Sequence, residues 1–287
     1  MSVWQFTGQG SQYLNMGNEY KDHAVFQRYW HHCEKIALKF DIHLSQLASN
    51  EALIHQTQYS QPLIFAYEYA LGMSLLQSSP PPQCIIGHSI GEYAAYVISN
   101  MIDLPTALQL IILRGALIGS LPLNTSGMLA VIGPYQKTID SLSSLKKIDL
   151  AAINHAQQVV FSGPLYALND AKNILKSQGI KSIALNVSHG FHSHCMDPIL
   201  DEFHEKASHI LSQTSNPSIS VISTTTGQPL NTLNPDYLKN HIRYPVNYWP
   251  VAQSLMNHPS FLEIGPKPIL TKLLQKEPIT AKWARLE

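Results

Sequence analysis

CIIGHSIGEYAAYVIS, at residues 84–99, is the most informative stretch of the chain. A short apolar run leads into Gly-His-Ser-Ile-Gly, and helix-forming residues follow. This order predicts a buried strand, a sharp turn and a helix, with Ser89 in the turn. Gly87 and Gly91 leave room for a turn that presents the hydroxyl at the end of a sheet. Ser89 is therefore either a nucleophile or a serine in a structural turn, and the pattern alone leaves both interpretations open.

The residues beside Ser89 suggest roles that depend on the nucleophile interpretation. The backbone N–H of Ile90, directly after the serine, would face an oxyanion that develops at the attacked carbonyl. His88 is a poor general base for Ser89, because adjacent residues in such a turn point in different directions. We expect His88 to pack in the core or to form a wall of a substrate site.

The rest of the chain predicts an α/β fold. The apolar run VWQF at residues 3–6 also leads into a glycine-bearing turn, which suggests buried parallel strands. After Pro122, three or four short strands alternate with two helices over about 65 residues. We predict a large α/β-hydrolase-like domain with a parallel sheet at 1–123 and 189–287. A small ferredoxin-like α+β lobe is inserted at 124–188.

Composition narrows the class of protein. The 287 residues are 45% hydrophobic, enough to bury a sizeable core. Lys+Arg and Asp+Glu both number 19, so no basic excess points to nucleic acid. The three cysteines lack metal-type spacing, which predicts reduced thiols and no structural zinc. With neither a signal peptide nor a membrane span in the sequence, we expect a soluble, cytoplasmic monomer.

A nucleophilic serine needs a base, and the 14 histidines of the chain leave the choice open. The densest group is LNVSHGFHSHCMDPIL at residues 185–200, which holds His189, His192 and His194. A metal site is the rival interpretation, but the spacing lacks supporting carboxylates or cysteines, so we predict no metal.

Arg114 lies in TALQLIILRGALIG, a helix that its apolar residues predict to be largely buried. Its guanidinium is paired with a protein carboxylate, reaches solvent, or awaits an anionic ligand. Arginine suits the last role because its planar fork binds a carboxylate through two parallel hydrogen bonds.

Seven segments, in order, resemble the malonyl-CoA:acyl-carrier-protein transacylase family, which includes the acyltransferase domains of polyketide and fatty acid synthases. The resemblance covers nearly the whole chain. Its segments are FTGQGSQYLNMG (6–17), GHSIGEYAA (87–95), LRG (113–115), NHAQQVVFSG (154–163), HGFHS (189–193), YPV (244–246) and FLEIGPKPIL (261–270).

The resemblance implies a role for each matching residue. Ser89 would carry the acyl group as an ester, and His192 would be its general base. The backbone N–H groups of Gln9 and Ile90 would form the oxyanion hole. Arg114 would bind the free carboxylate of a malonyl group. Malonyl-CoA and a phosphopantetheinylated acyl carrier protein would be the substrate and the partner, and no cofactor is implied.

Two features of the motifs bear on specificity and geometry. Malonyl-selective family members carry His-Ala-Phe-His, and here the string is His189-Gly190-Phe191-His192. Phe191 fills the space that a methyl branch would need, which favours malonyl, and we expect His189 to help bind substrate. Gly190 replaces the usual alanine and is expected to loosen the loop. Because Asn240 and His241 precede the Pro-Val motif, we expect a backbone carbonyl of this loop to orient His192.

The resemblance implies malonyl transfer, acting in trans for a polyketide synthase. One alternative with the same fold is a hydrolase that clears stalled acyl groups from carrier proteins, but Arg114, commonly changed in those proteins, is retained. A general esterase would show an HGGG-type oxyanion loop, which is absent. A non-catalytic carrier-binding module would be supported by loss of Ser89, His192 or Arg114, and all three are present.

Overall fold

The chain forms two β-sheets of different kinds, and a computed structural model describes residues 2–287. The larger sheet has five parallel strands in the order β7-β2-β1-β8-β9. The smaller has four antiparallel strands in the order β4-β5-β3-β6. The predicted class, a large α/β domain with a small α+β lobe, is confirmed. The strands are β1 (Val3–Phe6), β2 (Cys84–Gly87), β3 (Ser126–Ile132), β4 (Asp149–His155), β5 (Gln158–Pro164), β6 (Lys181–Ala184), β7 (Ser220–Ile222), β8 (Ser260–Ile264) and β9 (Thr280–Trp283).

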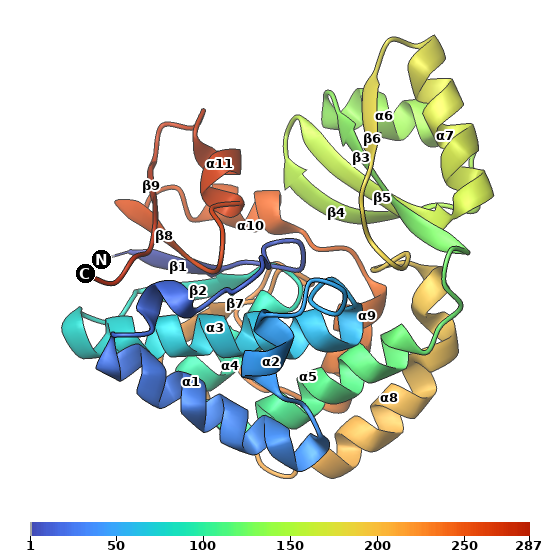
Figure 1. Cartoon of the computed structure of the whole chain (residues 1–287). Coiled ribbons are helices and arrows are strands. Elements are labelled where there is room, and N and C mark those ends of the chain that lie inside the picture. Colours follow the sequence, from blue (N-terminus) through green and yellow to red (C-terminus); the bar gives the residue numbers. More distant parts are fainter. Residues whose placement is uncertain (1) are drawn as a thin grey trace.

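Helices lie on both faces of the large sheet and on one face of the small one (Figure 1). The α-helices are α1 (Ala24–Ala37), α2 (Leu44–Ala48), α3 (Thr57–Ser78), α4 (Gly91–Ile98), α5 (Leu104–Gly119), α6 (Tyr135–Leu142), α7 (Leu165–Ser177), α8 (Asp197–Ile210), α9 (Pro235–Arg243), α10 (Tyr248–Ser254) and α11 (Leu270–Leu274). The described residues also form three short 3-10 helices: η1 (Asn18–Tyr20), η2 (Leu38–Phe40) and η3 (His194–Met196). None of the helices within residues 2–287 is long and apolar enough to cross a bilayer.

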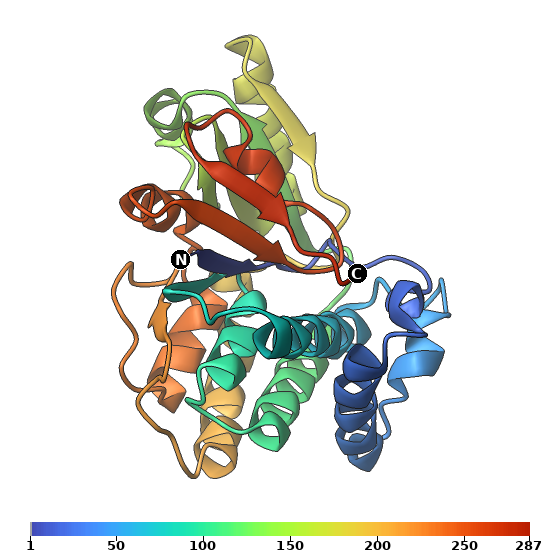
Figure 2. The same cartoon turned by 90° about the vertical axis from the view of Figure 1, so that its left-hand side faces the viewer.

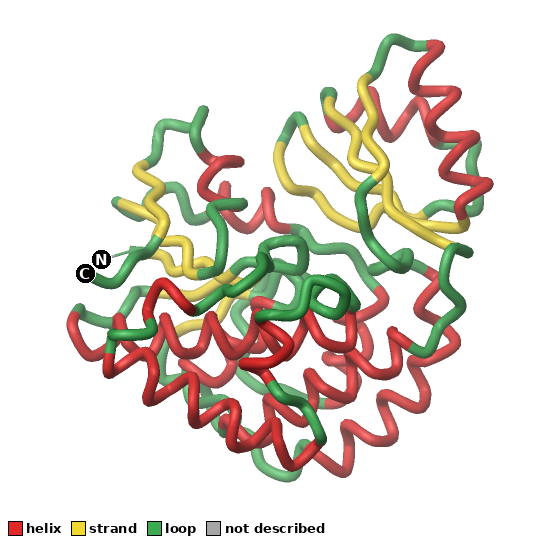
Figure 3. Tube along the Cα trace, in the orientation of Figure 1, coloured by secondary structure: helices red, strands yellow, loops and turns green. Residues whose placement is uncertain are grey.

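Alternating side chains of the central strands enter two separate cores. Trp4 and Ile85 belong to the core shared with α1, α3, α4 and α5. Val3 and Ile86 belong to a second core, shared with α10 and α11. Strand residues alternate between the two faces of a sheet, so one short apolar run supplies both cores. In Figure 3 the long helices of the large domain, in red, gather on one side of its sheet.

The small lobe has the βαββαβ order of a ferredoxin-like unit, from β3 through α6, β4, β5 and α7 to β6. Its strands use residues 126–184, inside the range 124–188 predicted for the lobe. Each strand presents one face to α6 and α7, which is why Leu129, Val131 and Val159 form a core of their own.

The other face of the small sheet meets the large domain. Ala130, Ala152 and Val160 share a core with Trp249 of α10 and Leu270 of α11. Val246 pairs with β4 through its backbone, its N–H donating to the carbonyl of Ala151 at 2.9 Å. Figure 2 shows the small lobe above the large sheet, on the side opposite the long helices of the large domain. The lobe is therefore anchored above the carboxyl ends of β1 and β2.

Candidate active site

Ser89 occupies the sharp turn between β2 and α4, and its backbone is in the left-handed region, with φ at +52°. A β-carbon on Gly87 would lie 2.2 Å from the backbone nitrogen of Glu92. A β-carbon on Gly91 would lie 2.4 Å from the carbonyl oxygen of Thr7. Only glycine fits at both positions, because a β-carbon would collide with neighbouring backbone atoms. A non-glycine residue held at positive φ is strained, and such strain gathers at functional sites.

His192 meets the serine from far along the chain. Its Nε2 lies 2.8 Å from the Oγ of Ser89, and its Nδ1 lies 3.0 Å from the carbonyl oxygen of Tyr244. A carbonyl only accepts, so Nδ1 carries the hydrogen and the neutral ring accepts the serine proton at Nε2. The ring is oriented by a backbone carbonyl, as the sequence predicts.

The environment of His192 keeps it uncharged. Burial lowers its pKa well below the usual range, and the positive charge of Arg114 lowers it further. His192 also has φ at +56°, in the left-handed region. A neutral imidazole within 2.8 Å of a hydroxyl is the arrangement that general-base catalysis requires.

Arg114 is buried in the wall of the cavity and has no charged partner among residues 2–287. Only 1% of the residue is exposed. Its Nη1 donates to Oε1 of Gln61 at 2.5 Å, and its Nη2 lies 3.4 Å from Oγ of Ser89. Its Nε finds no hydrogen-bond partner in the described part of the chain. In the described chain, no Asp or Glu oxygen lies within 4.0 Å of the guanidinium. Of the alternatives left open by the sequence, pairing to a protein carboxylate is not realised.

Gln61 is a site residue that the sequence analysis missed. It lies in α3 and is fully buried. Its Nε2 donates to Oγ1 of Thr57 at 2.7 Å, and Thr57 donates to Oε1 of Gln9 at 3.2 Å. This chain connects the guanidinium of Arg114 to the loop after β1. No signal in the sequence singles Gln61 out, because α3 begins with several polar residues, Thr57, Gln58 and Ser60 among them.

The two proposed oxyanion donors lie beside the nucleophile. Gln9 lines the same cavity as Ser89, and Ile90 follows Ser89 in the chain. Among the hydrogen bonds of residues 2–287, none is donated by the backbone N–H of Gln9 or of Ile90. Gly8 fixes this proximity, since a β-carbon there would lie 2.9 Å from Nδ1 of His88. Both N–H groups are free to meet a ligand oxygen.

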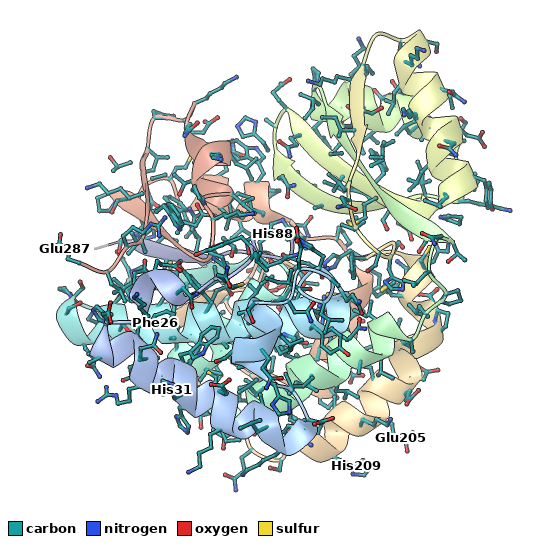
Figure 4. All side chains as sticks on the ribbon, viewed as in Figure 1. Phe26, His31, His88, Glu205, His209 and Glu287 are labelled. Carbon is teal, nitrogen blue, oxygen red and sulfur yellow. The ribbon has the colours of Figure 1, made fainter. Side chains whose placement is uncertain are left out.

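His88 forms a wall of the site and connects the two lobes. Its Nε2 lies 2.8 Å from Oδ1 of Asn154 on β4, a second residue that sequence reasoning did not assign. Burial lowers the pKa of His88, so the ring is neutral. In Figure 4 the labelled His88 lies at the centre of the molecule, between the helices of the large domain and the small lobe.

A cavity of about 230 Å³ opens at these residues. Ser89, Arg114 and His192 lie in it together with apolar side chains of both lobes. Those apolar residues are Met128, Ala130, Ala152, Val160, Leu185, Val187, Phe191, Ile269, Leu270 and Leu273. An apolar wall around a serine hydroxyl, a neutral imidazole and a buried guanidinium can hold a short acyl group that bears an anion.

Phe191 and His189 of the HGFH loop lie in different places. Phe191 lines the cavity and is buried. His189, predicted to bind substrate, does not line it; its ring nitrogens lie 2.8 Å from Oγ of Ser188 and 3.1 Å from the carbonyl oxygen of Leu121. The structure places His189 at the connection between the lobes.

Gly190 is needed because the loop is closely packed, and the loosening of the loop expected from the sequence is not found. Its N–H donates to Oγ of Ser126 at 2.9 Å, and its carbonyl accepts from Oγ of Ser193 at 2.6 Å. A β-carbon would lie 2.9 Å from Oγ of Ser162. The loop that carries His192 is thus packed directly against strands of the small lobe.

The histidine cluster of residues 185–200 is dispersed over separate contacts. His192 faces Ser89, His189 faces Leu121, and His194 faces Asp149. In the part of the chain that the structure describes, no three His, Cys, Asp or Glu side chains form a group that could hold a metal ion.

The family of acyl transferase domains matches residues 3–282. The chain is an acyltransferase of this family. It is 32% identical over 296 residues to orsellinic acid synthase ArmB of Armillaria ostoyae, covering 95% of this chain and 13% of that protein. It is 31% identical over 284 residues to the polyketide synthase Pks15/1 of Mycobacterium marinum, again covering 13% of the relative. The acyltransferase therefore spans a small part of these large relatives.

Solved structures of two kinds resemble the acyltransferase. The acyltransferase domain from the second module of the salinomycin polyketide synthase superimposes with a TM-score of 0.90 at 30% identity, covering 98% of this chain and 68% of that chain. An acyl carrier protein S-malonyltransferase from Vibrio cholerae superimposes with a TM-score of 0.88 at 25% identity, covering 98% and 96%. The acyltransferase thus has the architecture shared by malonyltransferases and polyketide synthase domains.

Proposed function

We propose that this acyltransferase moves a malonyl group from malonyl-CoA to the phosphopantetheine thiol of an acyl carrier protein, through an ester on Ser89. The observation that carries the proposal is the buried guanidinium of Arg114, which has no carboxylate partner and lies 3.4 Å from the nucleophilic oxygen. Malonyl-CoA is a thioester whose acyl group ends in a carboxylate, so it offers a carbonyl carbon to Ser89 and an anion to Arg114. The neighbouring malonyltransferase from Vibrio cholerae supports the choice of substrate.

The first half-reaction acylates the serine. His192 takes the proton of Ser89 at Nε2 while Oγ attacks the thioester carbonyl. The negative charge that develops on the carbonyl oxygen is stabilised by the free N–H groups of Gln9 and Ile90. The carbon–sulfur bond then breaks, and the departing CoA thiolate takes the proton from His192.

The second half-reaction reverses these steps with a new thiol. His192 deprotonates the phosphopantetheine thiol of the carrier protein, the sulfur attacks the acyl-serine, and Ser89 recovers its proton. Exchange of one thioester for another changes the free energy little. The main requirement is therefore to exclude water from the ester, and the apolar lining of the cavity serves it.

Arg114 selects for the carboxylate. An acetyl group would leave the buried guanidinium without an anion, a penalty of about 1–3 kcal/mol or more. Phe191 occupies the wall beside the acyl carbon and disfavours a methyl branch. Both features favour malonyl over acetyl and methylmalonyl groups.

The proposal extends to a carrier protein on a separate chain that serves polyketide assembly. This extension is supported by sequence identity: the chain is 32% and 31% identical to two polyketide synthases, and 25% identical to the malonyltransferase from Vibrio cholerae. Hydrolysis of the acyl-serine is the alternative with the same fold. Arg114 argues against it, because selection for a carboxylated extender is of no use to an enzyme that clears varied stalled chains.

Intact-protein mass spectrometry tests the proposal. Mixing with malonyl-CoA is expected to add one malonyl group to the wild type and to Ser208→Ala, an exposed control, but not to Ser89→Ala. Adding phosphopantetheinylated carrier protein then transfers the group to the carrier. No gain on the wild type, or a gain that persists in Ser89→Ala, overturns the proposal. Rapid loss without an acceptor supports the hydrolase instead.

A further inference from the structure

Asp149 lies where the small lobe meets two loops of the large domain. One of these loops carries His192, and the other orients its ring. Asp149 is the first residue of β4. The first loop continues into η3, and the second ends α9 at Arg243 and carries Tyr244, whose carbonyl orients His192. These two loops come from the large domain, while Asp149 belongs to the small one.

The carboxylate of Asp149 contacts both loops. Its Oδ2 accepts from the backbone N–H of His194 at 2.6 Å and lies 2.9 Å from Nδ1 of the same residue. It also lies 3.4 Å from Nη1 of Arg243. Arg243 completes the cluster, since its Nε lies 2.6 Å from Oδ1 of Asp197 at the start of α8. One carboxylate thus joins the residue two places after His192 to the residue just before Tyr244.

The conformation of His192 explains why such a connection is needed. Its φ of +56° is costly for a residue with a β-carbon, and such a conformation persists only where several contacts hold it. The bond from Nδ1 to Tyr244 spans two loops, so a small slip of either loop breaks it. The contacts of Asp149 oppose that slip from both sides.

We propose that Asp149 is a positioning residue for the catalytic histidine, acting with Arg243 to hold the His192 loop and the Tyr244 carbonyl in register. Asp149 touches no reacting atom; it determines the angle at which Nε2 of His192 faces Ser89. The inference rests on the proposed Ser89–His192 acyl transfer. It adds that the small lobe contributes to catalysis by aligning the base as well as by lining the cavity.

The test compares three variants of the full chain. Asp149→Ala removes all the contacts, Asp149→Asn keeps an acceptor for the His194 N–H but loses the charge, and Arg243→Gln removes the other half of the pair. Asp170→Asn, an exposed site on α7 of the same lobe, is the matched control. We measure Ser89 acylation by malonyl-CoA in single turnovers, and the His192 Nδ1–H signal by proton NMR.

Misalignment of a base by about 1 Å lowers rates by up to about 100-fold. We expect Asp149→Ala to lower the maximal acylation rate at least about 10-fold, with the half-saturating malonyl-CoA concentration changed less than about twofold. The maximal acylation rate of Asp149→Asn should lie between the rates of Asp149→Ala and the wild type. The double variant Asp149→Ala/Arg243→Gln should be no slower than the slower single variant, because both act through one contact.

The NMR signal separates this inference from the proposed function. Broadening or loss of the His192 Nδ1–H signal in Asp149→Ala, with retention in Asp170→Asn, supports positioning even if the acyl donor is not malonyl-CoA. A wild-type rate and an unchanged signal in Asp149→Ala overturn the inference. If Asp149→Ala does not fold, the same comparison in Asp149→Asn and Arg243→Gln decides, and unchanged behaviour in both overturns it.

Discussion

The guanidinium of Arg114 and the hydroxyl of Ser89 share one cavity, with Nη2 3.4 Å from Oγ. The cation is buried, and its neutral partners are Gln61 and Ser89 itself. A buried cation without a charged partner favours a ligand that brings an anion, which supports the proposal that Arg114 selects the acyl group that Ser89 receives.

Replacing Arg114 by leucine is expected to change selectivity. Acylation by malonyl-CoA should fall about 100-fold or more, because a charge-assisted pair worth about 2–4 kcal/mol is lost. Acylation by acetyl-CoA should fall less or rise, since no cation is left unpaired. The malonyl-to-acetyl ratio of single-turnover rates measures this, with Arg28→Leu as an exposed control. An unchanged ratio would contradict the assignment of Arg114.

Gln61→Glu should block the site with an internal carboxylate. The new side chain would lie where Oε1 now accepts from Arg114 at 2.5 Å, and its charge would satisfy the guanidinium. We expect the half-saturating malonyl-CoA concentration to rise about 10-fold or more, with a smaller effect on acetyl-CoA. Gln58→Glu, a neighbouring site on α3, serves as the control. Equal effects on both donors would argue against carboxylate competition.

The acylation rate should fall only at a pH below the usual pKa range of histidine; we call this fall the acid limb. Burial and the charge of Arg114 lower the pKa of His192, so the base remains neutral and competent as pH falls through the normal histidine range. In Arg114→Leu one of these charges is gone, the pKa of His192 rises, and the acid limb should move to higher pH. Acylation rates between pH 4 and 8 test the shift. A limb that stays in place in Arg114→Leu would disprove the electrostatic origin.

His241 should make folding sensitive to acid. Burial and the charge of Arg114 lower its pKa to about 3 in the folded state, against about 6.5 when unfolded. The folded-state pKa is depressed, so its contribution to stability is present above about pH 6.5 and is lost as pH falls toward 3. The free energy of unfolding should fall by up to about 1.4 kcal/mol per pH unit from this group. Urea unfolding should show that the free energy of unfolding of His241→Gln depends less on acid pH than that of the wild type. The exposed control His32→Gln should keep the wild-type dependence.

Gly190→Ala should weaken the contact between the histidine loop and the small lobe. The added β-carbon would lie 2.9 Å from Oγ of Ser162, so a loop or a strand must move. We expect a loss of about 1–3 kcal/mol in the free energy of unfolding. The second substitution Ser162→Gly removes the clash, and the double variant should recover part of the loss. Failure of this rescue would show that the penalty arises elsewhere.

Local patterns in the chain were sufficient for the turn at Ser89, the parallel strands β1 and β2, and the strands and helices of the small lobe. These features depend on neighbouring residues: apolar alternation marks a strand, and Gly87 and Gly91 permit the turn. Seven motifs in family order then predicted that Ser89, Arg114 and His192 act together. Their placement in a common cavity agrees with that prediction, whereas their catalytic roles stay predictions until tested.

Gln61, Asn154 and Asp149 became visible only when the chain was folded. Gln61 and Arg114 are 53 residues apart, and Ser89 and His192 are 103 residues apart. Proximity over such separations arises where the carboxyl ends of β1 and β2 meet the inserted lobe, and no local periodicity encodes it. A polar side chain in a helix or at a strand end has the same local pattern whether it faces solvent or a buried cation. Packing of the two lobes brings the carboxylate of Asp149 to the histidine loop and leaves the guanidinium of Arg114 without an anion.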